Sequence, residues 1–454
     1  MTHGYLLLRC WSPSDLTHPS ERLYGRSTNH ISTPTRDTNS PSPIGFDRPR
    51  VTPVMTLYDL YPDETLEQLQ NQLDRIASID LYEEHYADAD VDPTAVESWE
   101  DFRDLPFTTT DDLLTDLEEN GPEGSLHVEG SMISFTPAKD QQLPVYETPY
   151  DLEQLSVMHE TVFERLEIEP GDRAVIAFGY HGFGTGFLLH RTLEEYGCEV
   201  IPSGPGDSEE TAQLIDDFDV DVLWGNPSFA LEIAEHGGDS LDIFLGGGEP
   251  FTSIPGRREK VHEAFGDLEC AVDVFGLRQA WPVSLECAGE AGLHVVDDYM
   301  LVEIIDPETG EVLEPGERGE VVLTHLDREG TPLVRYRTGD LSVLDESTCD
   351  HCGATVTMPR GVFGRTDERH KVKGIKLYPE GVALVLAGFP ELSMSHRIEI
   401  DRDGNTDELT VIVEGEADRE ELREALTGQL QIQPDHIEFV DELEEGPTVV
   451  DNRY

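Results

Sequence analysis

Four side chains that can bind a transition metal occur in two short segments. Cys349 and Cys352 form a Cys-x-x-Cys pair, and Cys287 precedes His294 by seven residues. Three thiolates and one imidazole are a ligand set for tetrahedral zinc. The alternative is that they are four unrelated side chains of a protein that resides in a reducing cytoplasm. The spacing favours a structural zinc site with no open position for catalysis.

A second chemically informative stretch runs from Arg335 to Pro379. It predicts a short strand leading into a turn at Thr338-Gly339-Asp340, then a turn at 364–367 and a glycine-closed segment at 371–374. A carboxylate at the tip of a turn accepts hydrogen bonds only, which suits a pair of sugar hydroxyls. An isolated Gly-Asp is more often a solvated turn, so the order of the following motifs carries the argument.

That order, RYRTGD followed by GRTDE and KGIKLYP, resembles the adenylate-forming superfamily and specifically its phenylacetate-CoA ligase branch. The resemblance implies that Asp340 binds ribose and that Arg365 lies on the phosphate side. It also implies a hinge at Asp367, a pantetheine path at Gly374 and a catalytic contribution from Lys373.

The same resemblance predicts a nucleotide pocket at two strand ends. The residues expected beside adenine are Gly246, Gly247, Gly248, Phe275 and Gly276. After Phe275-Gly276 the family has a threonine for the α-phosphate and a glutamate for magnesium, whereas this chain has Arg278 and Gln279. A neutral carboxamide is a poor magnesium ligand, and Arg278 is a candidate to neutralise phosphate charge instead.

Two further departures concern phosphate chemistry. The segment 134–145 stands where the family has a glycine-rich phosphate loop, but it contains two prolines and no glycine. The segment 444–450, before Asp451-Asn452-Arg453, lacks the lysine that the family uses in adenylation. Binding of a triphosphate in the usual manner is therefore an open alternative.

Strand and helix patterns alternate from Gly171 onward, which indicates an α/β fold with a parallel sheet and sites at the carboxyl ends of its strands. The segment GYHGFGTG is similar to the acyl-pocket segment of the family. The predicted pocket residues are Tyr180, Phe183 and Pro227. The chain should comprise a large domain over 55–366, with parallel or mixed sheets flanked by helices, and a small mobile α+β domain over 367–454.

The charge balance is extreme, because 94 acidic residues face 31 basic ones and only five of these are lysines. With 37% hydrophobic residues, the composition indicates a folded protein with a hydrated acidic surface. We expect the cytoplasm of a high-salt organism, and neither nucleic acid nor a membrane as partner. Six scattered cysteines do not predict a disulfide framework.

Residues 1–54 differ from the rest, since they hold six arginines and only four acidic residues. Either they are a disordered extension or translation begins at Met55, where the composition changes. The second reading is preferred.

The leading prediction is an ATP-dependent acid-CoA ligase of an aryl acid such as phenylacetate, acting through an acyl-adenylate. Its partners would be the carboxylic acid, ATP and CoA, with Mg²⁺ in question, a structural Zn²⁺ and a possible homodimer. One alternative is a non-catalytic or repurposed paralogue that binds nucleotide or acyl-adenylate. A third is adenylation with transfer to an acceptor other than CoA.

Overall fold

The computed structural model describes residues 56–452, except for short gaps. The gaps are residues 140, 267, 367–369, 374, 378, 390, 404–405, 431, 441–442 and 444–447. The predicted extension and Met55 therefore lie outside the described residues, as do Asp367 and Gly374. Among the described residues, no helix is both long and apolar enough to cross a membrane.

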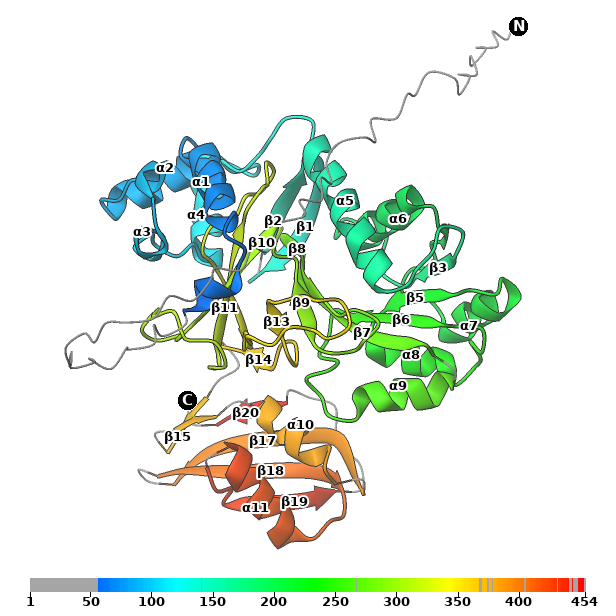
Figure 1. The fold of residues 1–454 in the computed structure, drawn as a ribbon. Coiled ribbons are helices and arrows are strands. Elements are labelled where there is room, and N and C mark those ends of the chain that lie inside the picture. Colours follow the sequence, from blue (N-terminus) through cyan, green and yellow to red (C-terminus); the bar gives the residue numbers. More distant parts are fainter. Residues whose placement is uncertain are drawn as a thin grey trace, which may run out of the picture. The chain divides into compact units, whose positions relative to one another are not determined.

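The largest sheet has eight strands in the order β13-β9-β8-β7-β6-β5-β3-β4 (Figure 1). Strands β3 to β7 are parallel, and β8, β9 and β13 extend the sheet in antiparallel fashion. The strands are β3 (Arg173–Ile176), β4 (Glu199–Ile201), β5 (Val222–Gly225), β6 (Ile243–Gly247), β7 (Cys270–Leu277), β8 (Ala280–Leu285), β9 (Leu293–Val295) and β13 (Thr357–Met358). The predicted α/β fold with a parallel sheet is confirmed.

Helices cover both faces of this sheet, because successive side chains of a strand point to opposite sides. On β3, Ala174 and Ile176 pack with residues of α5 and α6, whereas Val175, and Ala177 just after the strand, pack with residues of α7, α8 and α9. The helices are α5 (Pro149–Arg165), α6 (Thr185–Tyr196), α7 (Ser208–Asp217), α8 (Pro227–Ala234) and α9 (Arg257–Phe265).

A second, antiparallel sheet has the order β10-β11-β12-β14. Its strands are β10 (Met300–Ile305), β11 (Gly319–His325), β12 (Tyr336–Ser342) and β14 (Gly364–Arg365). It shares a core with the first helices, which are η1 (Leu57–Leu60), α1 (Thr65–Ile76), α2 (Asp80–Asp88), η2 (Pro93–Ala95), α3 (Trp99–Arg103) and α4 (Thr110–Asn120). Buried Arg335 links the two parts, because it pairs with Glu303 at 3.1 Å and donates to the carbonyl oxygens of Arg103 and Leu105.

The predicted turn at Thr338-Gly339-Asp340 is wrong, because these residues lie within β12. Gly339 has a φ of +78°, and the pairing of β12 with β11 shifts register there, which is the mark of a β-bulge. The strand then continues and pairs Asp340 with Arg365 of β14. The glycine thus allows a bulge in a continuous strand, and no chain reversal follows.

The last part of the chain forms its own small α+β unit around a separate core. Its elements are β15 (His370–Val372), β16 (Ile375–Leu377), α10 (Glu380–Leu386), β17 (Leu392–Asp403), β18 (Thr406–Gly415), α11 (Arg419–Leu430), β19 (His436–Val440) and β20 (Val449–Asp451). Four of these strands form a sheet in the order β19-β18-β17-β20. The domain boundary at residue 366 stays a prediction.

Candidate active site

Asp340 and Arg365, predicted on the nucleotide side, are brought together by the pairing of β12 with β14. The Arg365 guanidinium donates to an oxygen of the Asp340 carboxylate at 2.7 Å. Gly339 makes this approach possible, since a Cβ at that position would lie 2.9 Å from the guanidinium. The carboxylate is held in place by a cation and can accept further hydrogen bonds, as a ribose-binding group must.

Two of the glycines 246–248 lie within β6, because the strand extends through Gly246 and Gly247 and only Gly248 follows it. The Asn226 side chain, at the end of β5, donates to the carbonyl oxygen of Gly247 at 2.9 Å. Pro227 comes next and begins α8 as a buried residue. Because β5 and β6 are parallel neighbours, this amide fixes the two strand ends to each other at the edge where ligands bind in such sheets.

Phe275 and Gly276 lie near the end of β7, in the bend toward β8. Phe275 is half-buried. The Trp281 ring occupies the space beside Gly276, since a Cβ there would lie 2.4 Å from it. Only glycine therefore fits at residue 276, and the tryptophan stiffens the backbone that carries Phe275.

Arg278 is buried and paired. Its guanidinium donates to both oxygens of the Glu147 carboxylate, at 2.6 and 2.8 Å, and to the carbonyl oxygen of Phe183 at 2.7 Å. Arg328 adds a further contact to Glu147 at 3.2 Å. Three of the five donors of Arg278 thus serve contacts within the protein. Its contact with phosphate stays a prediction. A phosphate would have to compete with the Glu147 carboxylate for the same guanidinium.

Gln279 is also buried and belongs to a short hydrogen-bonded chain. Its side-chain amide donates to the Tyr336 hydroxyl at 3.1 Å, and that hydroxyl lies 2.9 Å from the Thr110 hydroxyl. Burial is the main reason why the pKa of Tyr336 is raised, so the phenol stays neutral at pH 7. A neutral amide beside a neutral phenol does not provide the carboxylate ligand that Mg²⁺ prefers.

The segment predicted as a loop in place of the phosphate loop is a β-hairpin. Strands β1 (Met132–Ala138) and β2 (Gln141–Glu147) pair along their whole length, up to Ala138 with Gln141. Ladder pairing engages backbone N–H groups that a phosphate loop would keep for its ligand. Lys139 forms an ion pair with Asp111.

Lys373 lies between β15 and β16. Its ammonium contacts both oxygens of the Asp435 carboxylate, at 2.7 and 2.6 Å. Burial acts to raise the pKa of Asp435, but the bonds from Lys373 and the Leu409 amide outweigh it and leave that pKa below its usual value. The predicted catalytic role of Lys373 would require this ion pair to open.

The predicted acyl-pocket residues precede or begin α6 and α8. The Tyr180 ring packs edge-on against Phe187 at 5.3 Å, and its hydroxyl lies 3.1 Å from His190 Nδ1. Phe183 is 37% exposed, and its carbonyl oxygen binds Arg278. The backbone around Phe183 is thereby fixed to the β7–β8 bend, while its ring remains accessible.

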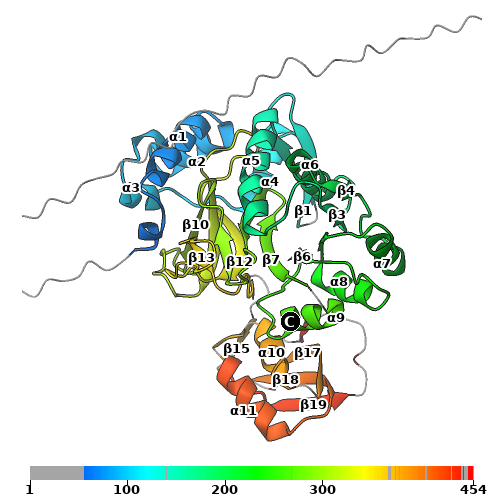
Figure 2. The same ribbon diagram turned by 45° about the vertical axis from the view of Figure 1, so that its right-hand side comes forward.

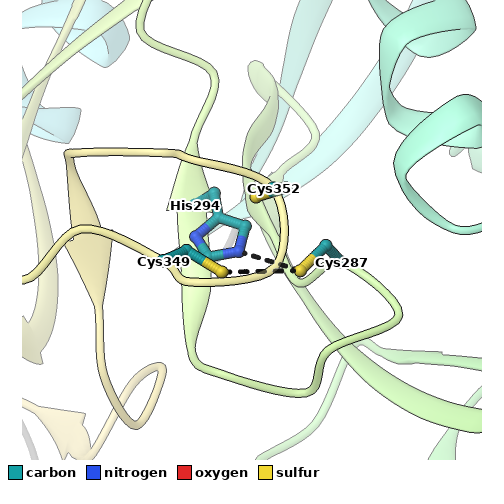
Figure 3. Close-up of side chains that lie close together, drawn as sticks. All are labelled: Cys287, His294, Cys349 and Cys352. Atoms are coloured by element: carbon teal, nitrogen blue, oxygen red, sulfur yellow. Dashed lines mark hydrogen bonds between the residues drawn. The ribbon is translucent and has the colours of Figure 1, made fainter.

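The four predicted metal ligands do converge (Figure 3). Cys287 follows β8, His294 lies in β9, and Cys349 and Cys352 belong to one loop. Their candidate ligand atoms all lie within 4.8 Å of one another. The Cys287 and Cys349 sulfurs are 3.8 Å apart, and His294 Nε2 is 3.4 Å from the Cys287 sulfur. A tetrahedron with Zn–S bonds of about 2.3 Å has edges of about 3.8 Å, so the donor set fits zinc.

Local structure prepares this cluster. The Cys349–Cys352 loop is closed by hydrogen bonds from Cys349 N–H to the Ala354 oxygen and from Gly353 N–H to the Cys349 oxygen, at 2.8 and 2.9 Å. Burial lowers the pKa of His294 to about 4, so its imidazole is neutral at pH 7, the form that binds a metal.

Comparison with known proteins identifies the family. No family model matches the chain. The phenylacetate-coenzyme A ligase of Thermus thermophilus is 32% identical over 375 residues, which are 78% of this chain and 82% of that protein. The chain belongs to the phenylacetate-CoA ligase family. The family's Pseudomonas putida ligase is 30% identical over 378 residues, covering 78% of this chain and 83% of its own.

Solved structures agree on the fold of this family member. A 2-hydroxyisobutyryl-CoA ligase in the postadenylation state matches with a TM-score of 0.75 at 22% identity, covering 86% of this chain and 89% of the other. Apo MatB from Rhodopseudomonas palustris matches with a TM-score of 0.53 at 16% identity, covering 69% of this chain and 64% of the other. The predicted adenylate-forming architecture is confirmed.

Sequence reasoning missed several residues that shape the site of this phenylacetate-CoA ligase relative. They are Thr110, Glu147, Asn226, Trp281 and Tyr336. Glu147 and Arg278 are 131 residues apart, so no local pattern links them. Asn226 carried a usable signal, since it directly follows a predicted strand of a parallel sheet.

Proposed function

We propose that this chain ligates an aryl carboxylic acid such as phenylacetate to coenzyme A. The relatives confirm the reaction class, an ATP-dependent acid-thiol ligation through an acyl-adenylate. In the first step the carboxylate attacks the α-phosphorus of ATP, and pyrophosphate leaves. In the second the CoA thiol loses its proton and attacks the acyl carbon, and AMP leaves. The observation that carries this proposal is the 32% identity to the Thermus thermophilus ligase across most of both chains.

The nucleotide would bind at the carboxyl ends of the strands. The Asp340 carboxylate, held by Arg365 at 2.7 Å, offers acceptors to the two ribose hydroxyls. The glycine segment 246–248 and Phe275 would enclose the adenine, with Asn226 and Trp281 fixing their backbones. Tyr180, Phe183 and Pro227 would line the acyl pocket, where aromatic side chains favour an aryl acid.

The phosphate side supports a rival proposal, a paralogue that binds nucleotide or acyl-adenylate without adenylating. Arg278 is neutralised by Glu147, Gln279 offers no carboxylate, and the β1–β2 hairpin engages its backbone in a ladder. Residues 278–279 therefore do not fit Mg²⁺ as ligands, and no step is assigned to that ion. A third proposal is transfer of the acyl group to an acceptor other than CoA. This reaction would begin with the same formation of an acyl-adenylate from the acid and ATP.

ATP–pyrophosphate exchange separates these functions. The purified chain, in molar KCl, is given ATP, labelled pyrophosphate and a panel of aryl and alkyl acids. The ligase proposal predicts exchange that depends on an aryl acid, followed by loss of the acid when CoA is added. Nucleotide binding without exchange for any acid would overturn it and favour the rival. Exchange without thioester formation would favour the other acceptor.

We also propose that Cys287, His294, Cys349 and Cys352 hold a structural zinc ion that ties the loop 349–352 to the end of β8 and to β9. Elemental analysis should find one zinc per chain. Cys349→Ser should lose it, whereas Cys198→Ser, which changes a buried cysteine outside the cluster, should keep it. Metal-free protein with an unchanged melting temperature would contradict the proposal.

A cytoplasm with high salt is proposed as the setting, on the strength of a net charge of −63. Salt relieves the self-repulsion of such a surface, so the melting temperature should rise between 0.1 and 2 M KCl. A homodimer is proposed as well, because Ile133, Phe135 and Phe187 are 49%, 41% and 52% exposed. Light scattering that finds only monomers would exclude it.

A further inference from the structure

A cavity of about 710 Å³ lies between α1, α5 and the β8–β10 part of the chain. Figure 2 shows α5 between α1 and α6. The volume is within the range of small-molecule sites. None of the residues predicted to bind nucleotide, acyl group or CoA lines it, and only His294 belongs also to the Cys/His cluster. The cavity is therefore separate from the residues predicted to bind the substrates of the ligation.

One wall of the cavity comes from α5, and its aliphatic part is formed by Val157, Met158 and Val162. Val157 and Met158 lie there one turn before Thr161 and Val162, and Arg165 follows one turn later. Residues four apart share a helix face, so Val157, Thr161 and Arg165 form one stripe. Val157 is 57% exposed, unusually open for a large apolar side chain of this protein. A ligand lying along this stripe could pack its apolar part against Val157 and place a negative group beside the Arg165 guanidinium.

Several charges of the cavity are already balanced within the protein. Arg75 donates to the Asp327 carboxylate at 2.8 Å, and the Tyr150 hydroxyl donates to the same group. Glu286 pairs with Arg258 and accepts from the N–H groups of Asp273 and Gly292. The charges of these groups are compensated within the protein, and their contacts hold the walls of the cavity in place.

Three charged lining residues are different. Among the residues that the structure describes, the Arg165 side chain has neither a hydrogen bond nor an ion pair, and neither Asp297 nor Asp298 has an ion-pair partner. Burial and the neighbouring Asp298 raise the pKa of Asp297, while Arg165 acts to lower it. Arg165 and Asp297 both line the cavity, and no hydrogen bond or ion pair joins them in the described residues. The cavity presents one cation and a pair of anions to whatever enters.

We propose that this cavity binds a small zwitterion with an apolar body, of the α-amino acid class. The ligand carboxylate would contact Arg165, its ammonium would contact Asp297 and Asp298, and its side chain would lie along Val157 and Met158. A ligand with one charge would leave the opposite protein charge unmatched as water is displaced, which is costly. The proposal rests on this cavity and is independent of the ligase activity.

Three probes with the same aromatic body test the charge requirement. L-phenylalanine carries both groups, 3-phenylpropionate only the carboxylate and phenethylamine only the ammonium. Titration calorimetry of the full chain, at one fixed salt concentration, should give phenylalanine at least tenfold higher affinity than either analogue. Equal or tighter binding of phenethylamine would overturn the proposal in favour of a cation site. No binding of phenylalanine would overturn it as well.

Two variants locate the binding. Arg165→Gln and Asp297→Asn should each weaken phenylalanine binding at least tenfold. Since neither side chain has an ion pair with a described residue, both variants should fold, and a melting curve verifies this. The matched control is Arg191→Gln on α6, which removes an arginine paired with Glu195 at 2.7 Å and should leave affinity unchanged. Unchanged binding in Arg165→Gln would place the ligand elsewhere and refute the proposal.

Discussion

Two arginine–carboxylate pairs near the proposed nucleotide site differ in one physical respect. In the Arg365–Asp340 pair the side chains are 41% and 10% exposed, whereas in the Arg278–Glu147 pair they are 1% and 3% exposed. The first pair has a solvent-exposed cation and a carboxylate that is largely buried. The second is an internal cross-link between the β7–β8 bend and the end of β2. Similar residue chemistry thus reaches the solvent in one place, where we propose a contact with ribose, and is fully internal in the other.

The largest expected effect concerns the buried pair. Glu147→Gln leaves Arg278 and Arg328 without their shared counter-charge in a buried place. We expect a loss of about 3–5 kcal/mol in the free energy of unfolding, because desolvated charges lose their compensation. Urea unfolding in molar KCl measures this. Asp111→Asn, which breaks the exposed pair with Lys139, is the control and should cost less than about 1 kcal/mol. A similarly small loss of unfolding free energy in Glu147→Gln and Asp111→Asn would show that the buried Arg278–Glu147 pair behaves like an exposed ion pair.

The second prediction concerns binding. Asp340→Asn should weaken ATP or AMP binding by about 10- to 100-fold, which corresponds to the loss of charged hydrogen bonds to the ribose. Its unfolding free energy should fall only slightly, because the Arg365 side chain is 41% exposed. Calorimetric titration with AMP provides the affinity, with Asp111→Asn again as control. Unchanged AMP affinity in a folded Asp340→Asn protein would remove Asp340 from the nucleotide site.

Salt should separate the two pairs further. A double-mutant cycle on Asp340 and Arg365 should give a coupling energy below about 1 kcal/mol at 0.1 M salt and less at 1 M, because the Debye length falls from about 10 to 3 Å. The cost of Glu147→Gln should change much less, since solvent ions do not reach a buried pair. Equal salt sensitivity would show that water reaches Arg278.

The smallest effect is expected at Lys373 and Asp435, whose side chains are 29% and 32% exposed. The pKa of Asp435 is lowered in the folded state, so the pair stabilises the fold above the unfolded pKa of about 3.9 and loses this effect as pH falls through the folded pKa. Asp435→Asn should cost less than about 1 kcal/mol at pH 7. The difference from the parent chain should shrink steadily as pH falls below the unfolded pKa of about 3.9, and a difference that does not shrink would contradict the ion-pair account.

The sequence predicts what local patterns encode. The alternation of strand and helix patterns from Gly171 onward follows from hydrophobic periodicity, and the structure shows it in the succession β3, α6, β4, α7, β5. The Cys/His cluster was accessible because its four ligands lie in two short segments, Cys287 to His294 and Cys349 to Cys352. Both kinds of signal depend on neighbours in the chain.

Long-range partners were not accessible. Nothing near Arg278 shows that Glu147, 131 residues earlier, would neutralise it. The bulge at Gly339 was read as a turn, because a positive-φ glycine is compatible with both and only the pairing with β11 and β14 decides. A hairpin at 132–147 depends in the same way on a ladder that no local residue demands.

The central claim is that the chain ligates an aryl acid to CoA although Arg278 is neutralised by Glu147. The most direct test incubates the chain with phenylacetate, ATP and CoA in molar KCl and quantifies products by mass spectrometry. The account predicts phenylacetyl-CoA and AMP in equal amounts, with little product from Asp340→Asn. Absence of both products across the panel of acids, with AMP still bound by the folded protein, would contradict it.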